Sequence, residues 1–153
     1  MLVSYNNKLV GLLTDRVWYD GCMRTYPEFY ASLHLPSWAP PPWVFGVAWS
    51  IIYPLFAFAT AYTIYRVIKG TLPRSMLWLI LGNWAFNLAF TPVQLGLEPL
   101  WPATIVILLV LGTLAAYQRL AWRHARLAFW LLVPYLAWGL FATALQATIT
   151  VTN

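Results

Sequence analysis

The sequence predicts an all-α integral membrane bundle with four clear transmembrane helices and an atypical, charged first segment, in a single membrane domain of residues 1–153. First, 61% of the residues are hydrophobic and only 8% are charged, whereas soluble domains carry about 25% charged residues. Second, four stretches of about 20 or more mostly apolar residues follow one another, each long enough as a helix to cross about 30 Å of hydrocarbon. Third, the charges gather in the connections between these stretches.

Residues 1–35 hold the atypical segment and the start of an outer loop. A short apolar patch at residues 9–13 is flanked by charged residues, namely Lys8, Asp15, Arg16, Asp20 and Arg24. Since each charge at mid-bilayer costs about 2.5–3.5 kcal/mol on insertion scales, this segment is a poor transmembrane helix on its own. It also lacks the sustained apolar core of a signal peptide. We therefore expect it either to lie at the membrane interface or to be shielded by other helices.

Residues 36–42 contain four prolines and form a stiff loop before the first clear span. Proline lacks an amide donor and pushes the residue before it toward extended geometry, so this stretch cannot be regular helix. Transmembrane helices are then expected at about residues 43–67, 77–97, 101–122 and 127–151. Their short connections make consecutive helices antiparallel neighbours.

Basic residues in two connections set the expected orientation. Residues 66–74 and 119–126 hold six of them, namely Arg66, Lys69, Arg74, Arg119, Arg123 and Arg126. Alternation of the helices puts both connections on one side, which the positive-inside rule assigns to the cytoplasm. The Pro-rich loop and the C-terminus then lie on the opposite side, in what we expect to be a bacterial cell envelope because no presequence is evident. The net charge of +5 is thus a topology signal, and no nucleic-acid partner is expected.

The motifs predict no metal site and no cofactor. Cys22 is the only cysteine, and His34 and His124 lie far apart without carboxylates at ligand spacing. No glycine-rich phosphate loop or nucleophile elbow is evident. Because no carboxylate or Lys lies deep inside a span, the pattern does not favour an ion or proton path.

Small residues recur at four-residue spacing in every span, at Ala57 and Ala61, Ala85 and Ala89, Gly112 and Ala116, and Gly139, Thr143 and Ala147. Such spacing lets membrane helices approach closely. The pattern predicts either ordinary packing within the bundle or a homodimer formed through one of these faces.

A layer of aromatic and amide residues is expected in the outer half of the bilayer. At 1.5 Å per residue, Trp49 lies about 9 Å, and Asn87 about 15 Å, below the outer ends of their helices. An interfacial aromatic belt accounts for Trp43 and Trp101 but not for Trp49 or Trp138. Asn87 is expected either to join helices or to orient a ligand, because an unpaired amide in hydrocarbon is costly. An apolar, aromatic cavity with one or two amides suits a flat hydrophobic ligand.

Three blocks of the sequence resemble a known family. They are residues 36–46 with Trp49 and Tyr53, residues 85–92 with Gly96, and residues 133–138 with 141–145. In this order and at these separations, the blocks resemble the translocator protein / tryptophan-rich sensory protein family, once called the peripheral benzodiazepine receptor. The resemblance covers about residues 26–150.

This resemblance implies a five-helix bundle, often a homodimer, with a hydrophobic pocket under the Pro-rich loop. It also implies a membrane receptor or sensor that binds porphyrins, other tetrapyrroles or other flat hydrophobic molecules and assists their transport or disposal. Mapped onto this chain, the family's ligand-binding positions are Tyr30, Trp38, Phe45, Gly46, Ala48, Trp49, Asn87, Phe90, Trp101, Leu108, Trp138, Ala142 and Leu145.

Two alternative functions remain open at this point. Trp49 and Trp138 match positions proposed in some family members to support light- or oxidant-driven porphyrin breakdown, and an indole can donate an electron to an excited porphyrin. The second alternative is that the chain is a structural or partner-binding membrane protein with a vestigial pocket. Residues 146–153 lack the Tyr followed by Lys or Arg that sterol recognition needs, so no cholesterol binding is expected.

Overall fold

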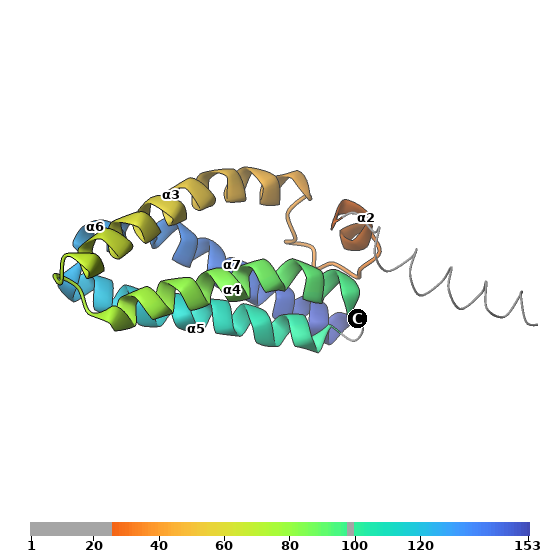
Figure 1. Ribbon diagram of the computed structural model, residues 1–153. Coiled ribbons are helices and arrows are strands. Elements are labelled where there is room, and N and C mark those ends of the chain that lie inside the picture. Colours follow the sequence, from red (N-terminus) through yellow and green to blue (C-terminus); the bar gives the residue numbers. More distant parts are fainter. Residues whose placement is uncertain (1–25, 98–99) are drawn as a thin grey trace, which may run out of the picture.

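The computed structural model describes residues 26–97 and 100–153, and every regular element in these ranges is a helix (Figure 1). The described helices are α2 at Tyr26–Ala31, α3 at Trp43–Ile68, α4 at Arg74–Gly96, α5 at Trp101–His124, α6 at Arg126–Leu131 and α7 at Val133–Thr152. The expectations for residues 1–25, including whether this segment spans the membrane, lie outside the described residues.

The helices α3, α4 and α5 are long and apolar enough to cross a membrane. Helix α3 begins at Trp43, directly after the last proline of the loop. Helix α4 begins at Arg74, three residues before the expected start, because the extended Pro73 is the last residue that departs from helical geometry. Helix α5 begins at Trp101 and has Pro102 in its first turn, where the missing amide costs no helical hydrogen bond.

The fourth expected span is divided in the structure, unlike the single helix predicted for residues 127–151. Helix α6 ends at Leu131, Leu132 departs from helical geometry (φ −100°, ψ 3°), and α7 restarts at Val133. Pro134 explains the break, because it lacks an amide donor and its ring displaces the carbonyl of Trp130, one turn earlier. Helix α7 is not among the candidate spans.

The helices pack unevenly around the bundle axis. Helices α4 and α5 lie side by side along their length, α7 packs against α5, and α3 makes fewer contacts with α4 and α7 (Figure 1). A core of buried side chains, including Phe56, Met76, Leu114 and Tyr117, joins α3, α4 and α5 toward the α3–α4 connection. The bundle is therefore tightly closed in that half, and the open space described below lies in the other half.

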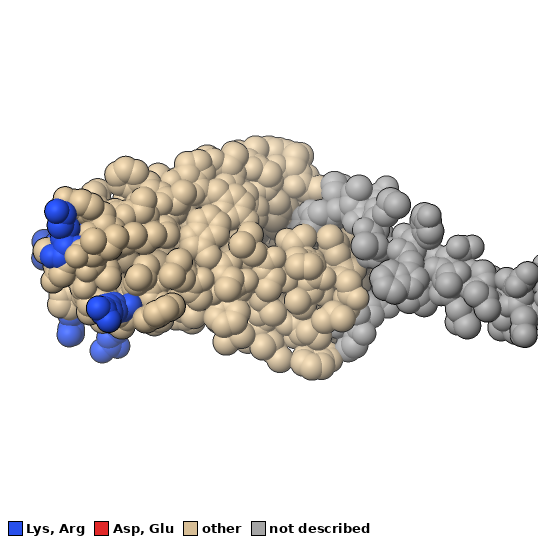
Figure 2. All heavy atoms as spheres, in the orientation of Figure 1, with Lys and Arg blue, Asp and Glu red and all other residues tan. Residues whose placement is uncertain are grey.

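The two ends of the bundle differ in charge. All six Lys and Arg residues of the described ranges lie in or beside the α3–α4 and α5–α6 connections, and Figure 2 shows them gathered at one end. At the opposite end, the Asn153 side chain accepts a hydrogen bond from the His34 amide at 2.7 Å and donates one to the His34 carbonyl at 3.2 Å. The C-terminus and the chain just before the Pro-rich loop therefore lie at the same end, opposite the basic connections.

Candidate functional site

A partly open cavity of about 340 Å³ lies between α3, α4, α5 and α7. Nine of the thirteen sequence-predicted ligand-binding residues line it, namely Tyr30, Phe45, Gly46, Trp49, Asn87, Phe90, Trp138, Ala142 and Leu145. A volume of this size falls at the lower end of the range typical for small-molecule sites.

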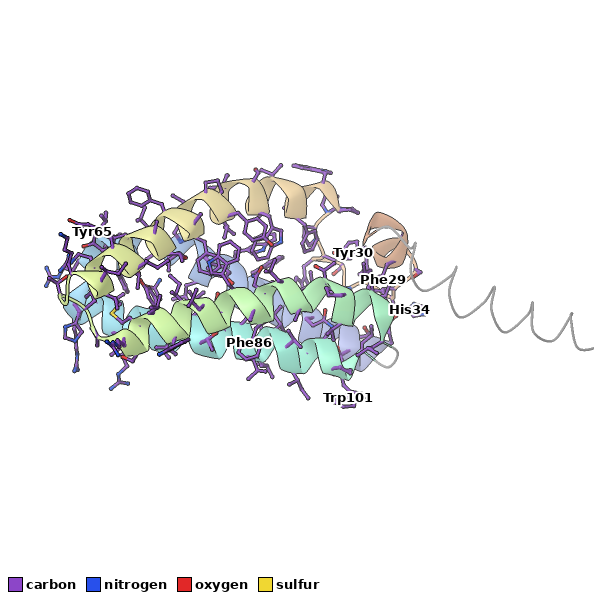
Figure 3. The ribbon with its side chains drawn as sticks, in the orientation of Figure 1. Phe29, Tyr30, His34, Tyr65, Phe86 and Trp101 are labelled. Carbon is purple, nitrogen blue, oxygen red and sulfur yellow. The ribbon has the colours of Figure 1, made fainter. Side chains whose placement is uncertain are left out.

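The Pro-rich loop is fixed over the cavity by Tyr30, which lies in α2 (Figure 3). Its hydroxyl donates a hydrogen bond to the Pro40 carbonyl at 3.0 Å, and its ring meets Phe45 edge-on with centroids 5.4 Å apart. Burial raises the pKa of the Tyr30 phenol above its ordinary value. The phenol therefore stays protonated at neutral pH and keeps donating to the loop.

Aromatic rings from α3 and α7 line the cavity and contact one another. On α3, Trp49 stacks on Tyr53 with centroids 4.8 Å apart, one helical turn along. On α7, Trp138 meets Phe45 of α3 edge-on at 5.6 Å, and Trp49 meets Tyr135 at 6.0 Å. Each of the two deep tryptophans, Trp49 and Trp138, is therefore held by a ring contact with the other helix.

Asn87 both joins helices and lines the cavity. Its amide oxygen accepts a hydrogen bond from the Tyr53 hydroxyl at 3.1 Å, and its amide nitrogen donates to the Tyr135 hydroxyl at 2.9 Å. Asn87 thus links α4 to α3 and α7 and retains one further N–H on its amide.

Asn83, one turn before Asn87, serves only to join helices. Its oxygen accepts from the Tyr135 hydroxyl at 2.9 Å, and its nitrogen donates to the Val110 carbonyl at 2.7 Å and to the Thr113 hydroxyl at 2.9 Å. Asn83 is 1% exposed and does not line the cavity. The four helices around the cavity are thus tied together by satisfied polar groups beneath it.

A second polar group lines the cavity and was not predicted from the sequence. Gln94 of α4 donates through its amide nitrogen to the amide oxygen of Gln146 of α7 at 2.8 Å. Both residues could have been found by helical spacing, because Gln94 lies seven residues after Asn87 and Gln146 lies four after Ala142. The same spacing explains Tyr53, four residues after Trp49, as a further lining residue.

Four predicted residues do not line the cavity. Trp38 is half exposed and packs edge-on against Phe141 at 5.8 Å, and Ala48 packs against the buried core instead. Trp101 points away from the bundle (Figure 3), and Leu108 is 52% exposed on α5. Neighbouring positions in a helix point about 100° apart, so Ile107 lines the cavity where Leu108 was expected.

The arrangement suits binding better than acid–base chemistry. The cavity lining contains no Lys, Arg, His, Asp or Glu in the part of the chain that the structure describes. Two buried polar atoms of lining residues have no hydrogen-bond partner among the described residues, namely the Trp138 Nε1 and the Gln94 Oε1. An apolar site with a few such polar groups is typical of sites that fix the orientation of a hydrophobic ligand.

Comparison with known proteins agrees with the resemblance found in the sequence. Residues 9–152 match the model of the TspO/MBR family. The chain is 35% identical over 135 residues to the tryptophan-rich protein TspO of Bacillus cereus, which covers 88% of this chain and 80% of that protein. It is also 35% identical to the human translocator protein, over 78% of this chain and 71% of that protein. It is 33% identical to the tryptophan-rich sensory protein of Cereibacter sphaeroides, over 82% of this chain and 77% of that protein.

These matches cover most of this chain and most of each relative, so they confirm the resemblance over the whole bundle. They also agree with the helical architecture, in which long apolar helices surround a cavity under a Pro-rich loop. The chain therefore belongs to the TspO/MBR family of five-helix integral membrane proteins.

Proposed function

We propose that the protein is a membrane receptor or sensor that binds porphyrins or other flat hydrophobic molecules in the cavity between α3, α4, α5 and α7, and that it takes part in their transport or disposal. The observation that supports this most is that Trp49 on α3 and Trp138 on α7 both line one cavity. Flat ligands gain from edge and face contacts with such rings, each worth about 0.5–1.5 kcal/mol beyond buried area.

A titration of protoporphyrin IX into the full-length protein in lipid nanodiscs tests this proposal. Saturable quenching of tryptophan fluorescence, with a stoichiometry of about one porphyrin per chain, is the expected result. Empty nanodiscs give the background from porphyrin dissolved in the bilayer. Quenching that rises linearly with porphyrin and never saturates would reject the receptor function and favour a structural or partner-binding protein with a vestigial pocket.

The second candidate function is photo-oxidative breakdown of the bound porphyrin. It is favoured by the position of the two indoles, since both Trp49 and Trp138 line the cavity in which the porphyrin would sit. Illumination of the complex in air, followed through the porphyrin absorption band, tests it. Faster loss of the band with wild type than with Trp138→Phe at equal occupancy supports breakdown, and equal rates remove Trp138 from that role.

We infer a homodimer from the exposed small-residue faces. Ala57 and Ala61 on α3, and Gly112 and Ala116 on α5, are exposed in the single chain, whereas Gly139 on α7 is buried. Exposed small residues at four-residue spacing favour close contact between helices of separate chains. Mass measurement of the protein in detergent tests this inference. A single-chain mass for wild type, across detergents that keep it folded, would contradict it.

The orientation proposed here places the basic end in the cytoplasm of a bacterial cell. It is supported by the six cations at the end of the bundle opposite the C-terminus. Ser75 and Ser37 are exposed at the two ends and allow a matched test. In a Cys22→Ala background, a membrane-impermeant maleimide added to intact spheroplasts should label Ser37→Cys and spare Ser75→Cys. The reverse pattern would invert the topology.

A further inference from the structure

The Gln94–Gln146 pair is a polar part of the cavity lining that lies outside the hydrogen-bond network of Asn83, Asn87 and Tyr135. Both residues are 3% exposed, and both line the cavity. Behind the pair, the Gln146 nitrogen donates to the Thr150 hydroxyl at 3.3 Å, and Thr150 hydrogen-bonds to Thr104 at 2.7 Å. The pair is therefore the cavity end of a polar chain that links α4, α7 and α5.

One atom in this series of hydrogen-bonded side chains has no hydrogen-bond partner among the described residues. The Gln94 Oε1 is buried and accepts no hydrogen bond from any described residue. By contrast, both amide groups of Asn83 and Asn87 are engaged by neighbouring helices. A buried carbonyl that loses its water and gains no donor costs about 1–3 kcal/mol, which a ligand group that donates to it would recover.

The chemistry of the pair selects a neutral polar group. An ionised carboxylate cannot donate to an amide oxygen, and no cation among the described lining residues could balance its charge. Rotating the two amides together would reverse the chain and leave a Gln94 N–H unpaired instead. A hydroxyl both donates and accepts, so it satisfies the unpaired atom of Gln94 in either arrangement.

We propose that Gln94 and Gln146 form a specificity site inside the cavity, and that this site selects flat ligands carrying a hydroxyl at the ring edge over the same ring without it. This inference rests on the proposed function, because it assigns a preference among ligands that the cavity already binds. Gln94 and Gln146 act here as binding residues with no role in bond making.

Two neutral porphyrins make a matched pair of probes. Haematoporphyrin dimethyl ester carries two hydroxyethyl groups where mesoporphyrin dimethyl ester carries two ethyl groups, and the two are otherwise alike. Full-length wild type in nanodiscs should bind the hydroxylated ester about five- to tenfold more tightly, after correction for partition into empty nanodiscs, since one recovered hydrogen bond has this effect. This measurement needs no variant.

A double variant assigns the preference to the pair. Gln94→Met/Gln146→Met removes both amides at nearly constant side-chain volume and should bring the ratio of the two dissociation constants to about one. Gln118→Met is the matched control, because Gln118 is equally buried and also has an unpaired amide oxygen but does not line the cavity. It should keep the wild-type ratio.

The outcomes separate the two proposals. If wild type binds both esters saturably with the same affinity, or if the double variant keeps the wild-type ratio, the specificity site is rejected and the receptor function stands. If neither ester binds saturably, the receptor function fails and this inference fails with it. If Gln118→Met also abolishes the preference, the loss reflects bundle stability, and the assignment of the preference to the cavity is overturned.

Discussion

The indole of Trp138 meets the ring of Phe45 edge-on, with centroids 5.6 Å apart and an interplanar angle of 79°. Phe45 also meets Tyr30 edge-on at 5.4 Å, so one ring on the first turn of α3 touches both α7 and the segment before the Pro-rich loop. Since Tyr30 in turn binds the Pro40 carbonyl, the loop, α3 and α7 are coupled at the mouth of the cavity.

Phe45→Leu should lower stability and loosen the cavity mouth. The change nearly preserves volume but removes two aromatic pairs, each worth about 0.5–1.5 kcal/mol. We expect a fall in the thermal unfolding midpoint of the protein in detergent, together with faster proteolysis of the Pro-rich loop. Phe58→Leu, at a ring 58% exposed on the outside of α3, is the control and should change neither. Equal loss of stability in both variants would show that the ring contacts of Phe45 add nothing specific.

Tyr135→Phe should destabilise the bundle more than its single lost hydroxyl suggests. The hydroxyl accepts from Asn87 and donates to Asn83, so its removal leaves two buried amide groups without this partner. The expected cost is about 1–3 kcal/mol in the free energy of unfolding. Tyr65→Phe, at an exposed tyrosine near the basic end, should be close to neutral. The measurement is unfolding in a denaturing detergent titration, and a neutral Tyr135→Phe would contradict the network.

Pro134→Ala should join α6 and α7 into a straighter helix. The substitution restores an amide donor and removes the ring that displaces the Trp130 carbonyl. Amide exchange at residues 132–136 should slow, because a hydrogen bond missing at the break can form. Because α7 carries Trp138, a straightened helix should also weaken porphyrin binding. Unchanged exchange at these residues would show that Pro134 is not the cause of the break.

The start of α3 could be predicted because a proline marks it, whereas the start of α4 was expected three residues too late and the break before α7 was not predicted. Trp43 follows the last proline of the loop, and the sequence predicts this start correctly. Pro134 also stands in the sequence, but a proline inside an apolar stretch is compatible with either a kink or a break. The sequence alone did not decide between the two, and the structure shows the break at Leu132.

For the cavity residues, the distance from the helix end could be predicted from the sequence, but the direction in which each side chain points could not. Counting residues from the helix ends places Trp49, Asn87 and Trp138 well inside their helices, and all three line the cavity. The same count cannot tell Leu108, which is exposed, from Ile107, which lines the cavity, because their heights differ by about 1.5 Å and their directions by about 100°. Helical spacing from Asn87 could have found Gln94, but its hydrogen bond to Gln146 could not be predicted, because Gln146 lies on another helix.

We propose above all that a flat hydrophobic ligand occupies the cavity between α3, α4, α5 and α7. Ala142 lines that space from α7, whereas Ala144, two residues later, is exposed on the outside of the same helix. The most direct test is the dissociation constant of protoporphyrin IX for wild type, Ala142→Leu and Ala144→Leu in nanodiscs. We predict that Ala142→Leu, which fills the cavity, weakens binding by about tenfold or more and that Ala144→Leu matches wild type. Equal affinities of all three proteins would contradict the account.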